Sequence, residues 1–228
     1  MFKHKQFFIF ILFFLMSCHS NHQNQENRPI TYLALGDSYT IGESVSEPDR
    51  WPNQLVKKLN ETDLLVSEAR ILAKTGWTTD ELIQAIQDST LAETYDFVSL
   101  LIGVNNQYRG RFVENYQKEF TTLLDIAIKF ADQKSSKVFV VSIPDWGITP
   151  FAKDRDAIKI ANEIDQFNTI AQEVCKQKKV PFVDITDISR RAQKDLTLLA
   201  KDGLHPSGKM YAFWVDRLLP KVIDLIKD

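Results

Sequence analysis

Short apolar runs alternate along this chain with longer segments whose apolar residues recur at helical spacing. Two of the runs, residues 97–102 (FVSLLI) and 137–143 (KVFVVSI), are nearly free of charge, as expected of strands buried on both faces. Further strands are predicted over residues 31–35, within 64–72 and over 180–183. Helices are predicted over residues 51–60, 80–87, 112–133, 157–178 and 207–226. The alternation predicts an α/β fold, a three-layer α/β/α sandwich with a flavodoxin-like, five-stranded parallel sheet.

The overall composition is that of an ordinary globular protein. Of 228 residues, 44% are hydrophobic and 25% are charged. We expect one domain over residues 30–228, which is long enough to bury a core without disulfides or a structural metal. The formal net charge is −2, and no basic stripe with interleaved aromatic residues occurs. We therefore expect no nucleic-acid partner.

The first residues have the pattern of a targeting segment. Lys3 and Lys5 precede an apolar run over residues 7–16, which at about 1.5 Å per residue is too short to span a bilayer comfortably. Residues 15–18 (LMSC) then resemble a bacterial lipobox. In that interpretation residues 1–17 are a lipoprotein signal peptide, cleaved so that Cys18 is lipidated. The alternative is a plain secretory signal in which Cys18 falls at the junction by chance.

The lipobox interpretation predicts a protein exported to the bacterial cell envelope and held at a membrane. Residues 18–29 are polar and without apolar periodicity, so we expect a flexible tether. The other cysteine, Cys175, then has no disulfide partner, and we expect it to be a buried, inert thiol on the apolar side of its helix. A zinc site is not expected, because the domain holds one histidine and no pair of cysteines.

Histidine usage narrows the candidate chemistry. Three of the four histidines lie in the first 22 residues, so His205 is the only imidazole in the predicted domain. It sits in residues 202–206 (DGLHP), where Asp202 is close enough in a tight turn to accept from its ring. Near the other end of the domain, Ser38 follows the first predicted strand directly. A serine hydroxyl needs an imidazole base, and the imidazole needs an acceptor, so these are the parts of a serine hydrolase.

Four segments resemble the blocks of the GDSL, or SGNH, hydrolase family, and they occur in the family's order. Residues 36–39 (GDSY) resemble the first block, with Tyr39 in place of leucine. Gly76 follows the second predicted strand, where the family has an oxyanion-hole glycine. Residues 103–106 (GVNN) resemble Gly-x-Asn-Asp, and residues 202–206 match Asp-x-x-His-Pro.

The resemblance implies a role for each matching residue and no cofactor. Ser38 is expected to be the nucleophile, His205 the general base and then general acid, and Asp202 the residue that orients the imidazole. The backbone N–H groups of Ser38 and Gly76, with the side-chain amide of Asn105, are expected to form the oxyanion hole. Asn106 replaces the family's aspartate, which leaves open the hydrogen bonding around its loop. Asp37 is expected to support the turn through hydrogen bonds between its side chain and the backbone, and not to act as the triad acid.

The expected function is a metal-independent serine esterase that works through an acyl-enzyme. Its substrates would be short- or medium-chain acyl esters, including lysophospholipids and thioesters, or O-acetyl groups on polysaccharide. Two alternatives use the same sequence features: a non-catalytic, lipid-anchored glycan-binding protein that kept an esterase fold, and acyl transfer to an alcohol. Segments that follow the site elements could shape the pocket, namely Trp51, Tyr108, Arg109, Arg111 and residues 144–151. Within the last segment, Trp146 and Phe151 could line an acyl or sugar site, and the alternative is that they are exposed packing residues.

Overall fold

The computed structural model describes residues 28–227, so the expected lipidation of Cys18 lies outside the described residues. A five-stranded sheet forms its centre, in the order β2-β1-β3-β4-β5. All neighbouring strands pair in parallel. The strands are β1 (Tyr32–Gly36), β2 (Arg70–Ala73), β3 (Phe97–Leu101), β4 (Val138–Val141) and β5 (Phe182–Val183). This confirms the predicted parallel sheet and its flavodoxin-like order.

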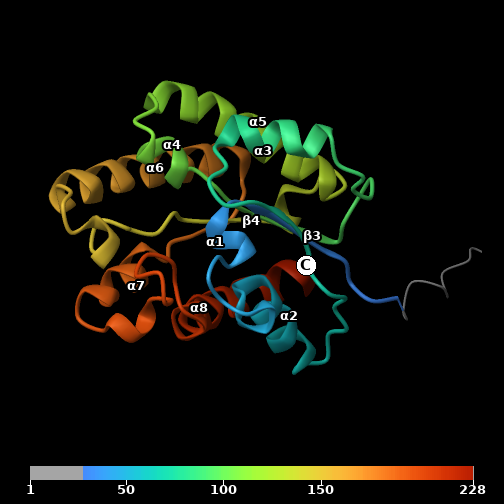
Figure 1. Ribbon diagram of the computed structural model, residues 1–228. Coiled ribbons are helices and arrows are strands. Elements are labelled where there is room, and N and C mark those ends of the chain that lie inside the picture. The colour runs from blue at the N-terminus through green and yellow to red at the C-terminus, as the bar shows by residue number, and fades with distance from the viewer. Residues whose placement is uncertain (1–27, 228) are drawn as a thin grey trace, which may run out of the picture.

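Helices cover both faces of the sheet, which completes the three layers (Figure 1). One layer holds α3 (Thr79–Gln87), α4 (Val104–Tyr108), α5 (Val113–Phe130) and α6 (Ala157–Lys178). The other holds α2 (Trp51–Asn60), α7 (Thr186–Arg190) and α8 (Gly208–Lys227). The one-turn helix α1 (Ser38–Ile41) follows β1 directly. No helix between residues 28 and 227 combines the length and apolarity that crossing a bilayer requires.

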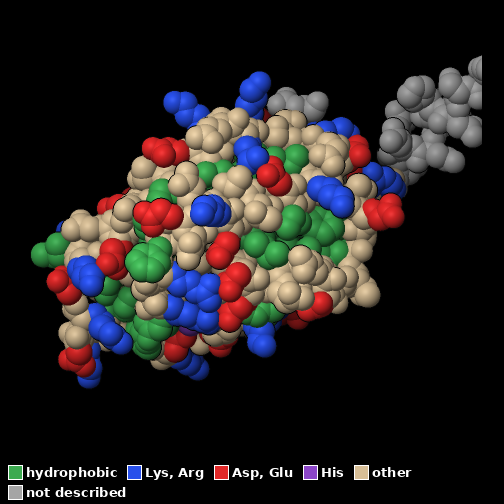
Figure 2. Space-filling model, turned by 90° about the horizontal axis from the view of Figure 1, so that it is seen from above, with side chains coloured by type: hydrophobic (Ala, Val, Ile, Leu, Met, Phe, Trp, Pro, Cys, Tyr) green, Lys and Arg blue, Asp and Glu red, His purple; other side chains and the backbone are tan. Residues whose placement is uncertain are grey.

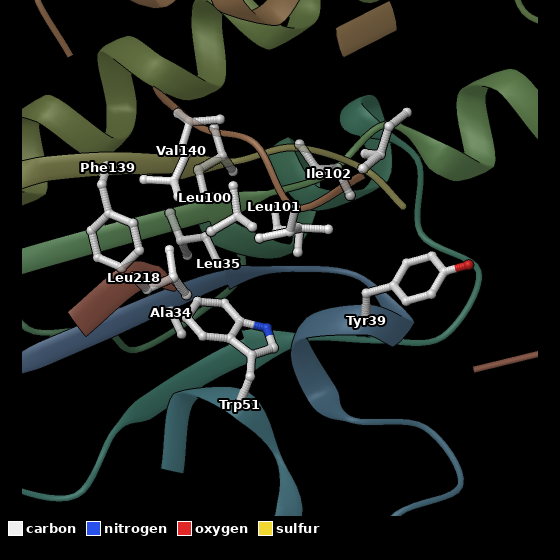
Figure 3. Packing of buried hydrophobic residues seen from close by; sticks show 14 of the residues in the cluster. Ala34, Leu35, Tyr39, Trp51, Leu100, Leu101, Ile102, Phe139, Val140 and Leu218 are labelled. Carbon is white, nitrogen blue, oxygen red and sulfur yellow. The ribbon is translucent and has the colours of Figure 1, made fainter. Parts of the chain in front are cut away.

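The central strands form the floor of the core. Every residue of β1, β3 and β4 is buried, whereas the edge strand β2 is only partly covered. Tyr32 of β1 stacks on Phe97 of β3 with ring centroids 4.3 Å apart. Trp51 is fully buried and packs beneath the sheet near Ala34 and Leu218 (Figure 3). Trp51 therefore belongs to the core and does not shape the pocket, because it begins α2 with its ring directed inward.

The predicted long helices and strands are confirmed, with shifts of a few residues at their ends. The second strand forms only at the end of its predicted segment, and residue 66 there makes a single bridge to Ile30. Helices α1, α4 and α7 were not predicted, because helices of four or five residues are too short to show a periodicity. Cys175 is buried as expected, and burial raises the pKa of its thiol to about 12.

The molecular surface mixes both signs of charge. Figure 2, seen from above relative to Figure 1, shows Lys and Arg side chains lying among Asp and Glu side chains, with small apolar patches between them.

The carboxyl ends of the strands share one edge of the sheet, and the strand order reverses between β1 and β3. That reversal is where proteins of this topology bind ligands. The segments after β1 and β3 therefore form the natural place for a site.

Candidate active site

The turn after β1 presents Ser38 at the reversal point. Asp37 is the N-cap of α1, and its Oδ1 accepts the backbone N–H of Tyr39 at 3.0 Å, as expected. Gly36 is needed before it, because a Cβ there would collide with the carbonyl oxygen of Leu101. Ser38 itself is only 4% exposed. The serine is thus fixed by strand, cap and core together.

Asp37 is a fully buried carboxyl group with an unusual titration. Burial raises its pKa to about 7, although the backbone N–H of Tyr39 lowers it in part. Its Oδ2 has no hydrogen-bond partner within residues 28–227. The carboxylate that contacts the imidazole is instead Asp202.

The turn before α8 joins His205 to Asp202. The Nδ1 atom of His205 lies 2.6 Å from Asp202 Oδ2. Asp202 Oδ1 accepts the backbone N–H groups of Leu204 and His205, each at 3.0 Å. Partial burial would raise the pKa of Asp202, but hydrogen bonds from His205, Ser44 and the backbone outweigh it and hold the pKa at about 2. Asp202 is therefore a carboxylate at neutral pH and selects the tautomer of His205 that carries its proton on Nδ1.

Ser38 and His205 meet in one pocket of about 170 Å³, together with Gly76 and Asn105. The ring of Tyr39 packs against the imidazole, with centroids 5.4 Å apart. Among the described residues no hydrogen bond joins the Ser38 hydroxyl to His205. Such contacts are often long in a free enzyme and tighten when substrate binds. The fold thus brings together five of the expected residues: Ser38, Gly76, Asn105, Asp202 and His205.

The loop after β2 carries Gly76 at a φ of +89°, a conformation that favours glycine. A Cβ there would meet only Arg109, at 3.8 Å, so the backbone conformation rather than lack of space explains the glycine. The loop is held from outside. The Arg109 guanidinium donates to the Gly76 carbonyl at 2.6 Å, and Thr75 donates to the carboxylate of Glu43.

Asn105, the second residue of α4, lines the same pocket. Its Nδ2 donates to the carbonyl oxygen of Trp77 at 2.9 Å. A primary amide carries two N–H donors, so this contact fixes the amide and leaves one N–H for a ligand. The contact also connects Asn105 to the loop that contains Gly76.

Asn106 has a structural partner that explains the departure from the family's aspartate. It is fully buried, and its Oδ1 accepts the backbone N–H of Thr79 at 3.1 Å. Its Nδ2 donates to Thr79 Oγ1 at 2.6 Å, which in turn donates to Glu119. A carboxylate could not donate to that hydroxyl. Asn106 therefore anchors the start of α3 to α4.

Three aromatic side chains form one wall of the pocket. Trp146 lies 5.2 Å from Tyr108 and 6.1 Å from Phe151, measured between ring centroids. Trp146 is buried, whereas Tyr108 and Phe151 are about half exposed. The Trp146 indole donates to Gln107 Oε1 at 2.7 Å, and Gln107 donates to Glu163 at 2.8 Å. Gln107 was not predicted, since nothing in the sequence distinguishes it from a surface residue of a short helix.

A metal centre has no support in the part of the chain that the structure describes. No group of three His, Cys, Asp or Glu side chains lies close enough together there to hold an ion.

Comparisons with known proteins identify the family and the fold. Residues 34–213 match the model of the GDSL-like lipase/acylhydrolase family. None of the curated proteins compared with the chain matches it in sequence. Many solved structures resemble it, and the similarity at this level of identity concerns the fold.

Three of these structures illustrate the likeness. TesA has a TM-score of 0.67 at 17% identity, covering 86% of this chain and 99% of its own. A mutant of Axe2, an acetyl-xylooligosaccharide esterase from Geobacillus, has a TM-score of 0.64 at 19% identity, covering 85% and 94%. A lipase/acylhydrolase from Enterococcus faecalis has 0.63 at 21%, covering 85% and 95%.

The family match covers most of the chain, and it includes Ser38 and His205. The parallel sheet, the reversal point and the pocket agree with it. The chain therefore belongs to the GDSL-like lipase/acylhydrolase family and is a hydrolase that acts on ester bonds.

Proposed function

We propose that the protein is a serine esterase in which Ser38 is the nucleophile, His205 the general base and Asp202 the acid of the triad. The observation that carries this proposal is the shared pocket. Ser38 and the hydrogen-bonded His205–Asp202 pair line or border one cavity with Gly76 and Asn105. Those are the groups that acyl transfer requires.

The reaction follows from the positions of the protons. His205 Nε2 takes the proton of the Ser38 hydroxyl as Oγ attacks the ester carbonyl, and Asp202 accepts from Nδ1–H and stabilises the imidazolium. The backbone N–H groups of Ser38 and Gly76 and the Asn105 amide donate to the oxyanion. The imidazolium then protonates the departing alcohol, leaving an acyl-enzyme. Water, deprotonated by His205, releases the carboxylic acid and restores Ser38.

Labelling with a fluorophosphonate probe tests the nucleophile. The probe should form one covalent adduct, on Ser38, and His205→Ala should lose labelling because its serine keeps its proton. Ser46→Ala serves as the control for reaction at another serine of the same segment, because Ser46 donates to the non-catalytic Asp49. An adduct on another residue, or undiminished labelling of the His205 variant, would refute the assignment.

For the substrate, we propose short- to medium-chain acyl esters. The pocket wall of Tyr108, Trp146 and Phe151, with Leu204 beside His205, is apolar and suits an acyl chain or an apolar alcohol. A second candidate is the O-acetyl group of a carbohydrate. It is favoured by the half-exposed rings of Tyr108 and Phe151, which could pack on a sugar, and by the likeness to an acetyl-xylooligosaccharide esterase.

One pair of assays separates the two substrate classes. Initial rates on nitrophenyl esters of increasing acyl length give the chain-length profile, and acetate release from acetylated oligosaccharides gives the other activity. If acyl esters are the substrate, the initial rate should be highest for an acyl chain longer than acetyl. Carbohydrate O-acetyl esterase activity predicts a sharp preference for acetyl and a higher kcat/KM on the sugar. Failure of both, together with no labelling of Ser38, would support the binding-protein alternative.

We further propose that the protein is lipidated at Cys18 and anchored to a membrane of the bacterial envelope. The described chain begins at the amino ends of the strands, where Arg28 pairs with Asp96 at 2.6 Å, whereas the pocket lies at their carboxyl ends. The ten residue steps from Cys18 to Arg28 extend to at most about 36 Å. A domain of this size is about 40 Å across. If the opening of the pocket lay against the anchoring bilayer, the tether would have to be fully stretched. We therefore propose that the substrates are esters outside that bilayer.

Vesicles that carry the lipidated protein test the anchor and its consequence. The protein should float with vesicles, and Cys18→Ser should not. A water-soluble ester should be cleaved equally by both forms, whereas esters within the same bilayer should be cleaved poorly. Insertion of about 15 Gly and Ser residues after residue 27 should raise cleavage of those bilayer esters. Unchanged cleavage with the longer tether would contradict the proposed orientation.

A further inference from the structure

The carboxylate of Asp202 receives one hydrogen bond from outside its own turn. Its Oδ1 accepts only backbone N–H groups of that turn, those of Leu204 and His205. Its Oδ2 accepts from His205 Nδ1 at 2.6 Å and from the hydroxyl of Ser44 at 2.7 Å. Ser44 is 158 residues away in sequence and follows the helix that begins with Ser38. The hydroxyl therefore joins the turn of the base to the segment of the nucleophile.

Ser44 holds this place in an unfavourable backbone conformation. Its φ is +65°, in the left-handed region that glycine adopts readily and other residues rarely do. Two residues earlier, the same segment has a glycine, Gly42, at a similar φ of +68°. Glycine at position 44 would remove the strain but also the hydroxyl. Strain retained where a side chain reaches a functional group indicates a role for that side chain.

The segment that carries Ser44 also reaches the oxyanion side of the pocket. Glu43 accepts a hydrogen bond from Thr75, which precedes Gly76. Residues 42–46 thus contact both the Asp202 turn and the Gly76 loop. The other contacts between the nucleophile and base segments act on different atoms: Tyr211 donates to the Tyr39 carbonyl at 3.1 Å, and the Tyr39 ring packs on the imidazole. Among the described residues outside the turn of Asp202, Ser44 is the one that hydrogen-bonds to the Asp202 carboxylate.

We propose that Ser44 is a positioning residue for the catalytic carboxylate. Its hydroxyl fixes the rotation of Asp202 so that Oδ2 stays in line with His205 Nδ1, and the imidazole then stays directed at Ser38. The proposal rests on the catalytic roles proposed above for Ser38, His205 and Asp202. Ser44 does not line the pocket, so its loss acts on turnover rather than on substrate binding.

The expected effect is moderate. A hydrogen bond to a charged group contributes more than one between neutral groups, but Ser44 is exposed and water can replace part of its contact. Loss of the hydroxyl should therefore lower kcat roughly three- to tenfold while KM stays within about twofold.

Two substitutions separate the hydroxyl from the backbone. Ser44→Ala removes the hydroxyl and keeps the unfavourable conformation, whereas Ser44→Gly removes both. We expect the same fall in kcat for the two variants, although Ser44→Gly should melt at an equal or higher temperature than the wild type. Ser46→Ala is the matched control, because Ser46 lies in the same segment and donates to a non-catalytic carboxylate, Asp49, at 2.6 Å. It should leave kcat and KM unchanged.

A double-mutant cycle tests whether Ser44 acts through Asp202. The effect of Ser44→Ala should fall below about twofold in an Asp202→Asn background, measured at raised enzyme concentration. Wild-type kcat in Ser44→Gly would overturn the proposal, and so would an undiminished effect of Ser44→Ala in the Asp202→Asn background. An active, Ser38-labelled wild type alongside such results would leave the esterase assignment intact, whereas an unlabelled wild type would overturn the esterase assignment itself.

Discussion

The two halves of the pocket are held in place by different means. On the nucleophile side Asp37, Ser38, Tyr39 and His205 are all buried and are fixed by core packing. On the oxyanion side Gly76, in the loop after β2, and Asn105, in the short helix α4, are both partly exposed. There the carbonyl of Gly76 is held by the exposed side chain of Arg109.

The two sides of the pocket therefore differ in how firmly their groups are held. Ser38 and His205 are enclosed by the core, so changes to the Ser38 side chain should affect chemistry while the fold persists. The Gly76 loop depends on surface hydrogen bonds and ion pairs, which salt and water weaken. Substitutions on the two sides should therefore differ in size, in salt dependence and in their effect on stability.

The largest effect is expected at the nucleophile. Ser38→Ala should lower kcat by about 10⁴–10⁶-fold, because no other group can form the acyl-enzyme. The melting temperature should change little, since the side chain is small. Steady-state rates and calorimetry check the two halves of this prediction. Ester cleavage at the wild-type rate would show that Ser38 is not the nucleophile.

The next largest effect is expected at Asn105 on the oxyanion side. Asn105→Ala removes one donor to the transition state and should lower kcat by about 10²–10³-fold, with a small change in KM. Labelling of Ser38 by a fluorophosphonate should slow as well, because the phosphoryl oxygen uses the same donors. A rise in KM at constant kcat would instead make Asn105 a substrate-binding residue.

The buried carboxyl next to the nucleophile gives a prediction about stability. The folded-state pKa of Asp37 is about 7, above its ordinary value of 3.8, so the folded protein holds this proton more tightly than the unfolded chain. Stability should therefore fall as pH rises from about 4 to 7. Asp37→Asn should remove that loss, with a gain of at most about 4 kcal/mol at pH 8 and none at pH 4.

Thermal unfolding of both proteins across this pH range provides the measurement. Asn keeps the acceptor for the Tyr39 N–H, so the cap should survive. A variant that is less stable than the wild type at pH 8 would mean that the buried carboxylate is stabilised in the folded protein.

The smallest effect is expected at Arg109, which supports the Gly76 loop from the surface. Arg109→Ala should lower kcat about two- to fivefold, and high salt should reduce the difference from the wild type. Arg109 pairs with Glu81 of α3 at 3.1 Å, and Arg111 pairs with Asp80 of the same helix at 2.5 Å. Arg111→Ala is therefore the matched control, because Arg111 makes no hydrogen bond to the Gly76 loop. Equal effects of the two substitutions would show that Arg109 acts on helix α3 in general.

On both sides of the pocket the sequence predicts the functional residues better than the contacts that hold them in place. Ser38, Asp202 and His205 could be assigned because a lone imidazole and a serine after a strand restrict the chemistry strongly. The contacts of Ser44 with Asp202, Asn106 with Thr79 and Gln107 with Trp146 could not be predicted. They join side chains far apart in the chain, and the short helices that position them have no periodic pattern. For Trp51 the sequence allowed both the core and the pocket, because Trp51 lies on the apolar stripe of its helix and also follows a site element. Its ring enters the core.

A crystal structure of the protein inhibited by a small phosphonate tests the central claim most directly. The account predicts phosphorus bonded to Ser38 Oγ and one phosphonyl oxygen about 2.7–3.1 Å from the N–H groups of Ser38 and Gly76 and from Asn105 Nδ2. His205 Nε2 should lie within hydrogen-bond reach of Ser38 Oγ. Phosphorus on another residue, or an oxyanion that turns away from both Gly76 and Asn105, would contradict it.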